Sequence, residues 1–99
     1  MVIVIGEMVV RKENLKEFLE EVERMEEVTR KEDGCISYAM ALDDEAEGII
    51  SIAERWRDEA SLRVHLATDS VKGFIERCGP MIVSMSGNLY DAINERDVM

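Results

Sequence analysis

The sequence predicts an α+β fold, an antiparallel four-stranded sheet with helical segments packed on it. Three observations carry this prediction: a length of 99 residues, which is that of one domain; runs of β-branched or alternating apolar residues; and apolar residues at helical spacing between those runs. Hydrophobic residues make up 46% of the chain and charged residues 34%, a balance typical of folded proteins. We expect one domain over residues 1–99, with its core at about residues 2–90 and a polar tail at 91–99.

The first strand is predicted over residues 1–10, an apolar run rich in β-branched side chains. Val2, Val4 and Met8 share one face of this strand. The residues at positions 3, 5 and 9, which share the other face, are apolar as well. Because both faces are apolar, we expect both to be covered.

A helix is predicted from about Leu15 to about Lys31, where apolar residues recur at helical spacing with acids and bases opposite them. Asn14 and Glu17 form a plausible capping pair at its start. Gly34, which can adopt the left-handed conformation, is expected to stop the helix. The acidic face of the helix is expected to be solvated surface.

A hairpin is predicted next, with strands over Cys35–Leu42 and Ile49–Arg57 and a polar turn at residues 43–48. Large and small side chains alternate strictly along the first of these strands. The small set predicts that another layer packs closely on that face.

Two short helices are expected after the hairpin, over residues 59–67 and 70–77. Asp58 is a good N-cap for the first of them, and Thr68 or Asp69 for the second. A fourth strand follows at residues 81–90, and the polar tail beyond it is expected to be a frayed helix.

The resulting order, β-α-β-β-α-β, is the ferredoxin-like arrangement, in which the helices cover one face of the sheet. The other face would expose a large apolar patch in a single copy of the chain. The simplest remedy is a second copy packed sheet to sheet, so we expect a homodimer through the sheet faces.

The charge and the cysteine content exclude several classes of function. The chain holds 22 Asp plus Glu against 12 Lys plus Arg, a net charge of −10, which disfavours nucleic-acid and membrane partners. No apolar run is long enough to span a bilayer and no secretory signal is visible, so we expect a cytoplasmic protein. Cys35 and Cys78 are too few for a disulfide framework, and one histidine is too few for a zinc site of Cys and His alone.

Two ionisable residues are candidates for chemistry, and each has a structural alternative. His65 is the only histidine, and it is either a surface or edge histidine or a proton carrier that faces a cavity between helices and sheet. Glu54 shares a strand face with apolar residues. It is either a structural ion-pair partner of Arg55, Arg57 or the other subunit, or a catalytic base with a raised pKa.

Two aromatic residues, Trp56 and Tyr38, are candidates for binding a ligand. Each of them could instead fill the core or the dimer interface. A buried Trp56 would need a hydrogen-bond acceptor for its indole N–H.

Two stretches carry a resemblance to a known family. Thr29–Tyr38 (TRKEDGCISY) resembles the TR-x-E-x-GC-x-x-Y stretch of the antibiotic biosynthesis monooxygenase domain family. Ala53–Thr68 (AERWRDEASLRVHLAT) is similar to that family's E-x-W-x-D-x-x-A-L-x-x-H-x-x-T segment. The order of the stretches and their spacing also match, and the likeness covers roughly residues 2–90.

The resemblance implies a dimeric α+β barrel of the quinol monooxygenase type. Characterised members of this family include enzymes that oxidise phenols or quinols with O2 and without metal or flavin, so the resemblance implies no cofactor and a small-molecule substrate. By the same resemblance, His65 is the catalytic polar group at the cavity, and Trp56 and Tyr38 line it. Glu54 would hydrogen-bond to one of these side chains and orient it.

The sequence departs from relatives that carry a second histidine just after the threonine, since Thr68 is followed here by Asp69. The haem-degrading branch typically has an asparagine on the first strand, where this chain has Gly6 and Glu7. The alternatives that remain are a non-catalytic dimeric binding or stress-associated module, and an isomerase or hydrolase of a small metabolite.

Overall fold

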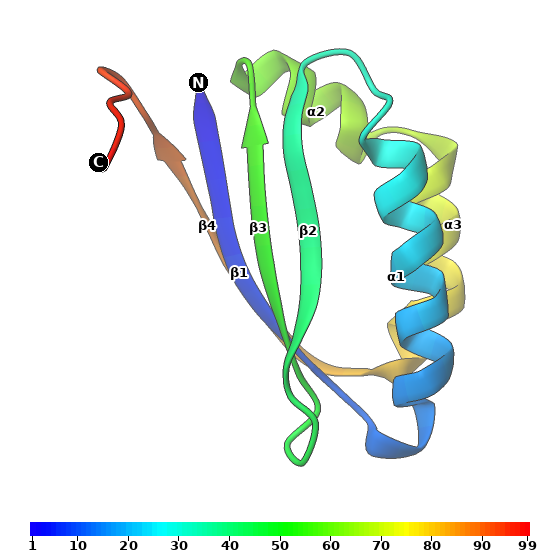
Figure 1. Cartoon of the computed structure of the whole chain (residues 1–99). Coiled ribbons are helices and arrows are strands. Elements are labelled where there is room, and N and C mark those ends of the chain that lie inside the picture. The colour runs from blue at the N-terminus through cyan, green and yellow to red at the C-terminus, as the bar shows by residue number, and fades with distance from the viewer.

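A computed structural model describes residues 1–99 and consists of a four-stranded antiparallel sheet with all helices on one face (Figure 1). The strands are β1 (Val2–Val10), β2 (Cys35–Asp44), β3 (Ile49–Trp56) and β4 (Ile82–Asp91). The helices are α1 (Leu15–Thr29), α2 (Glu59–Leu66) and α3 (Asp69–Cys78), with short 3-10 turns η1 (Lys12–Asn14) and η2 (Gly79–Met81). The sheet order β2-β3-β1-β4 confirms the predicted ferredoxin-like fold.

The register of the sheet decides which residues face the helices. β1 is central and pairs antiparallel with both β3 and β4. Val4 lies opposite Glu54 on β3 and opposite Leu89 on β4, so these three side chains share the helix face. Gly6 lies opposite Gly87 in the same way. The sheet therefore presents a carboxylate and a pair of glycines to the space beneath the helices.

The core fills the space between this face and the helices. Its fully buried side chains come from every layer of the fold: Trp56, Phe18, Met8, Ile50, Val10, Thr29 and Cys78. Phe18 of α1 meets Phe74 of α3 edge to face, with ring centroids 5.7 Å apart, so the two long helices pack against each other as well as on the sheet. The apolar spacing in the sequence thus identified the faces that are buried.

Helix α1 begins at Leu15 as predicted, but its cap and its end differ from the expectation. Asn14 makes no capping hydrogen bond, because it already has helical backbone angles as the last residue of η1. The helix ends at Thr29 rather than near Lys31, and Gly34 adopts a φ of +84° as the chain turns into β2. Glu32 lies in the turn between α1 and β2.

The sequence predicts that the acidic face of α1 is solvated surface, but one glutamate of this helix is buried. Glu21 is buried and accepts hydrogen bonds from Arg24 on the same helix and from Arg77 on α3. These guanidinium groups hold the pKa of Glu21 below its ordinary value. This residue therefore joins the two helices.

The second half of the chain follows the predicted caps. Asp58 accepts a hydrogen bond from the Ser61 backbone N–H at 2.8 Å and starts α2, and Thr68 accepts one from Val71 at 3.2 Å and starts α3. The expectation of a frayed helix in the tail is wrong: residues 92–99 contain no helix. The tail extends away from the helices (Figure 1). None of the helices combines the length and the apolar character needed to cross a bilayer.

Candidate functional site

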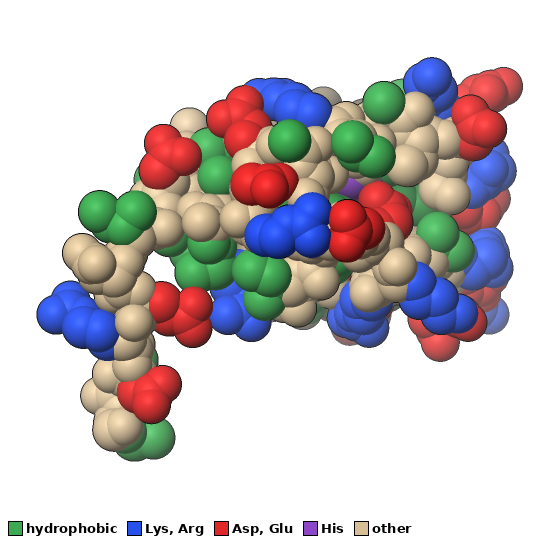
Figure 2. Space-filling model, turned by 90° about the horizontal axis from the view of Figure 1, so that it is seen from above, with side chains coloured by type: hydrophobic (Ala, Val, Ile, Leu, Met, Phe, Trp, Pro, Cys, Tyr) green, Lys and Arg blue, Asp and Glu red, His purple; other side chains and the backbone are tan.

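His65 of α2 is buried against the sheet and is not a surface histidine. Its residue exposure is 3%, and only a small purple area of it is visible between its neighbours in Figure 2. The imidazole ring lies 4.8 Å from the Trp56 ring and 5.5 Å from the Tyr38 ring, centroid to centroid. Trp56 and Tyr38, which the resemblance grouped with His65, therefore both lie next to its ring.

A carboxylate orients this histidine. Nδ1 of His65 lies 3.1 Å from both carboxylate oxygens of Glu32, whose side chain is 19% exposed. In the neutral imidazole, an Nδ1–H donated to Glu32 leaves the lone pair on Nε2. Nε2 makes no hydrogen bond in the chain. The only fully buried polar side-chain atom without a partner is Thr29 Oγ1, so Nε2 keeps some contact with solvent. This nitrogen is therefore available for a hydrogen bond with a ligand.

Sequence reasoning missed Glu32 as a functional residue. Its partner is 33 positions away in the chain, and no periodicity relates the two. The one signal was its position inside the Thr29–Tyr38 stretch, where it matches the glutamate of the family motif.

Glu54 is held by Trp56 and not by an arginine. The indole Nε1–H donates to Glu54 Oε1 at 2.9 Å, whereas Arg55 and Arg57 bond to other partners. The expectation of an ion pair with either arginine is therefore wrong, because Arg55 donates to Ser37 and Arg57 donates to Asp33 instead. Burial raises the pKa of Glu54, although the indole hydrogen bond and the nearby His65 oppose the rise.

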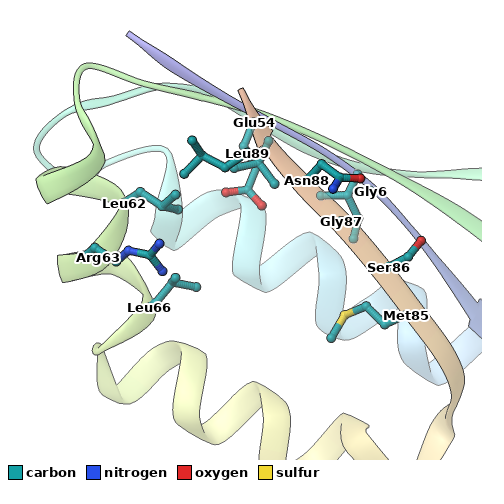
Figure 3. Close-up of a pocket in the computed structure, with 12 residues that line it drawn as sticks. Gly6, Glu54, Leu62, Arg63, Leu66, Met85, Ser86, Gly87, Asn88 and Leu89 are labelled. Atoms are coloured by element: carbon teal, nitrogen blue, oxygen red, sulfur yellow. The ribbon is translucent and has the colours of Figure 1, made fainter. Parts of the chain in front are cut away.

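Two cavities meet at Glu54. The outer one, of about 390 Å³, lies between α2 and the β1–β4 edge, and Figure 3 shows the Glu54 carboxylate directed into it. Its lining is mostly apolar: Val4, Gly6, Ile52, Glu54, Leu62, Arg63, Leu66, Met85, Ser86, Gly87, Asn88 and Leu89. The inner cavity, of about 160 Å³, is bordered by His65 and Tyr38. Both cavities share Ile52, Glu54, Leu66 and Met85.

The floor of the outer cavity is a pair of glycines. Gly6 and Gly87 lie directly opposite each other in the β1–β4 register, so no side chain projects from the helix face at that point. A Cβ on Gly6 would come within 2.6 Å of the Ser86 backbone oxygen, whereas a Cβ on Gly87 would meet its nearest atom at 3.7 Å. Gly6 is required for close strand contact, and Gly87 is the position where a side chain would occupy the cavity.

The two aromatic candidates have different positions. Tyr38 borders the inner cavity, and burial raises the pKa of its phenol, which keeps the hydroxyl protonated. Trp56 is fully buried and lines neither cavity. It acts on the site through the hydrogen bond to Glu54. The structure has no group of three or more His, Cys, Asp or Glu side chains that could hold a metal ion, and both cysteines are free.

Comparison with known proteins identifies the family. The family model described as antibiotic biosynthesis monooxygenase matches residues 1–77, more than three quarters of the chain. The chain belongs to the antibiotic biosynthesis monooxygenase family. A candidate member of this family from Deinococcus radiodurans has a crystal structure that superposes with a TM-score of 0.91 at 25% identity, and the match covers 100% of this chain and 99% of that one.

Two relatives are similar in sequence. YcnE, a candidate monooxygenase of Bacillus subtilis, is 27% identical over 77 residues, which are 78% of this chain and 81% of that protein. An uncharacterised Synechocystis protein, sll1783, is 30% identical over 76 residues, which are 77% of this chain but only 52% of that protein. The chain thus spans about half the length of the Synechocystis relative. Together, the family and YcnE support a monooxygenase as the class of activity.

The glycine pair gives the first prediction. Gly87→Val is expected to place a side chain in the outer cavity and to change the free energy of unfolding by no more than about 0.5 kcal/mol, because its Cβ meets no close neighbour. Gly6→Ala is expected to lower that free energy by about 1–3 kcal/mol, because the Ser86 oxygen belongs to the backbone of a paired strand. Urea unfolding of both variants checks the difference. Equal loss of stability would contradict the placement of the two glycines.

The raised pKa of Glu54 gives the second prediction. The folded protein holds the Glu54 proton more tightly than the unfolded chain, so stability falls as pH rises from the ordinary value of 4.5 through the folded pKa. Glu54→Gln is therefore expected to raise the melting temperature at pH 8 and to have little effect at pH 4. Thermal unfolding at both pH values measures this. Glu47→Gln, an exposed carboxylate in the turn before β3, controls for the loss of one negative charge.

A structural ion pair would give the opposite result. If Glu54 stabilised the fold as a charged partner, Glu54→Gln would lower the melting temperature most at pH 8.

Proposed function

We propose that this protein is a cofactor-independent monooxygenase of the quinol type, acting on a small quinol, phenol or related aromatic compound. The observation that carries the proposal is a buried imidazole, oriented by Glu32, next to a protonatable Glu54 at the junction of two apolar cavities. An apolar pocket with a few convergent polar groups is the arrangement expected of a site for a small organic ligand. A non-catalytic module with a filled interior is disfavoured, because the space beside His65 is open.

In the proposed reaction, the substrate supplies all the electrons. A deprotonated quinol is electron-rich enough to reduce O2 directly. For hydroquinone, one O2 gives 2-hydroxy-1,4-benzoquinone and one water. One oxygen atom enters the ring and the other leaves as water, while four electrons pass from the ring to O2. The protein is then required to bind the ring, exclude water and move protons.

The site residues have distinct tasks in this proposal. Glu54 takes a proton from the substrate hydroxyl, and its raised pKa brings it closer to neutral pH, where a base is most effective. Nε2 of His65 accepts or returns a proton at the inner cavity. The protonated Tyr38 hydroxyl is available as a donor, since it makes no hydrogen bond in the chain. Trp56 and Glu32 are positioning residues.

Oxygen uptake tests the proposal. With a panel of substituted hydroquinones, we expect the wild-type protein to consume O2, and His65→Ala to do so about 10²–10⁴-fold more slowly because a proton carrier is lost. Glu32→Gln should retain the fold and lower the rate, since the imidazole loses the carboxylate that orients it. Glu47→Gln serves as the exposed control. The absence of turnover with every quinol, or equal rates in wild type and His65→Ala, would contradict the proposal.

We also propose that the bare face of the sheet forms a homodimer, as the resemblance to dimeric α+β barrels implies. No helix covers this face (Figure 1). Ile5 and Tyr90 on it are 50% and 53% exposed. Ala39 and Ala53 lie in register with Ile5 and are small enough for a second sheet to approach closely.

Sedimentation tests the dimer. The wild-type protein is expected to sediment as a dimer at micromolar concentration. Ala53→Glu should sediment as a monomer, because it places a charge in the centre of the proposed interface. Ala46→Glu, in the exposed turn before β3, is the matched control and should remain dimeric. A stable wild-type monomer would overturn this part of the proposal.

A further inference from the structure

Arg63 provides a single positive charge at the outer cavity. Arg63 and Glu54 are the only charged residues among the twelve that line this cavity. Figure 3 shows the Arg63 guanidinium extending from α2 between Leu62 and Leu66, while the Glu54 carboxylate enters from the sheet. No hydrogen bond or ion pair joins the two charged groups, and Arg63 is not among the causes of the shifted pKa of Glu54. The cavity therefore has the carboxyl group of Glu54 at one side and a cation at the other.

The Arg63 guanidinium retains free donors. Its Nε and Nη2 both bond to a single oxygen of Glu59, Oε2, at 3.2 and 3.1 Å. Its Nη1 makes no hydrogen bond in the chain. The pair with Glu59 spans one helical turn between side chains that are 62% and 52% exposed, and such pairs are weak. A ligand can therefore engage Arg63 without breaking a strong interaction.

The chemistry of the two ends defines the ligand that fits. A guanidinium is the side chain best suited to bind a carboxylate with two parallel hydrogen bonds. Between the charged ends, the floor of the cavity is the bare backbone of Gly6 and Gly87, and its walls include Leu62, Leu66 and Leu89. A flat floor between apolar walls suits a planar ring.

We infer that the ligand of this cavity is a hydroxylated aromatic acid, with its hydroxyl group at Glu54 and its carboxylate at Arg63. The assignment of the hydroxyl end rests on the proposed function. The assignment of the carboxylate end rests on Arg63 alone. This assignment narrows the substrate class from neutral quinols to aromatic acids.

Calorimetric titration with two matched probes tests the inference without turnover. 4-Hydroxybenzoate and 4-hydroxybenzamide have nearly the same shape and differ in charge. The wild-type protein is expected to bind the benzoate about tenfold more tightly or better, as a charge-assisted hydrogen-bonded pair allows. This preference would run against the net charge of −10, which repels anions in general.

Variants at Arg63 locate the preference. Arg63→Gln should bind both probes with equal affinity. Arg63→Lys should retain part of the preference, because lysine keeps the positive charge but cannot form the two parallel hydrogen bonds of a guanidinium. Lys72→Gln on α3 removes one positive charge outside the cavity and should bind as the wild type does. Equal binding of both probes to the wild type, an unchanged preference in Arg63→Gln, or no binding of either probe would overturn the inference.

Oxygen uptake separates this inference from the proposed function. If both hold, 2,5-dihydroxybenzoate is oxidised with a lower KM than hydroquinone, and Arg63→Gln removes the difference. Preferred binding of the benzoate without oxygen uptake from any quinol would overturn the proposed oxygenase function and support the inference that the ligand is an anion. Oxygen uptake from hydroquinone with no carboxylate preference would overturn the ligand class and leave the oxygenase.

Discussion

The structure depends on the burial of polar side chains on an apolar sheet face. A buried imidazole or carboxyl group is costly unless it has a hydrogen-bond partner. Here the buried His65 and the partly buried Glu54 each have a different partner. His65 on α2 has Glu32, which lies in the turn before β2, and Glu54 has the indole of Trp56 two residues along the same strand. The packing of α1, α2 and β3 is therefore what holds the candidate site together.

These partners leave the site only partly satisfied. Glu54 uses one oxygen for the indole, and burial still raises its pKa, while Nε2 of His65 and the Tyr38 hydroxyl have no partner in the chain. Donors and acceptors that have no partner in the chain and lie beside an apolar space are the groups that a ligand can bind.

The outer cavity exists because two glycines leave the sheet without side chains near its edge. β4 is an edge strand, and the glycine pair removes side chains where it meets β1. The short helix α2 then contributes one apolar wall, through Leu62 and Leu66, and the single cation Arg63. A side chain at position 87 would meet no close backbone neighbour and would narrow this space.

By itself, the sequence determined the order of the elements, the apolar face of α1, the caps at Asp58 and Thr68, and the grouping of His65, Trp56, Tyr38 and Glu54. All of these follow from local spacing, from residue type or from a resemblance in two short stretches. Only the tertiary structure decided that Glu32 orients His65, that Trp56 rather than an arginine holds Glu54, that Glu21 is buried, and that Gly6, Gly87 and Arg63 share one cavity. The physical reason is that these contacts join side chains whose direction depends on helix ends, strand register and rotamers, and no periodicity in the chain encodes where two such side chains meet.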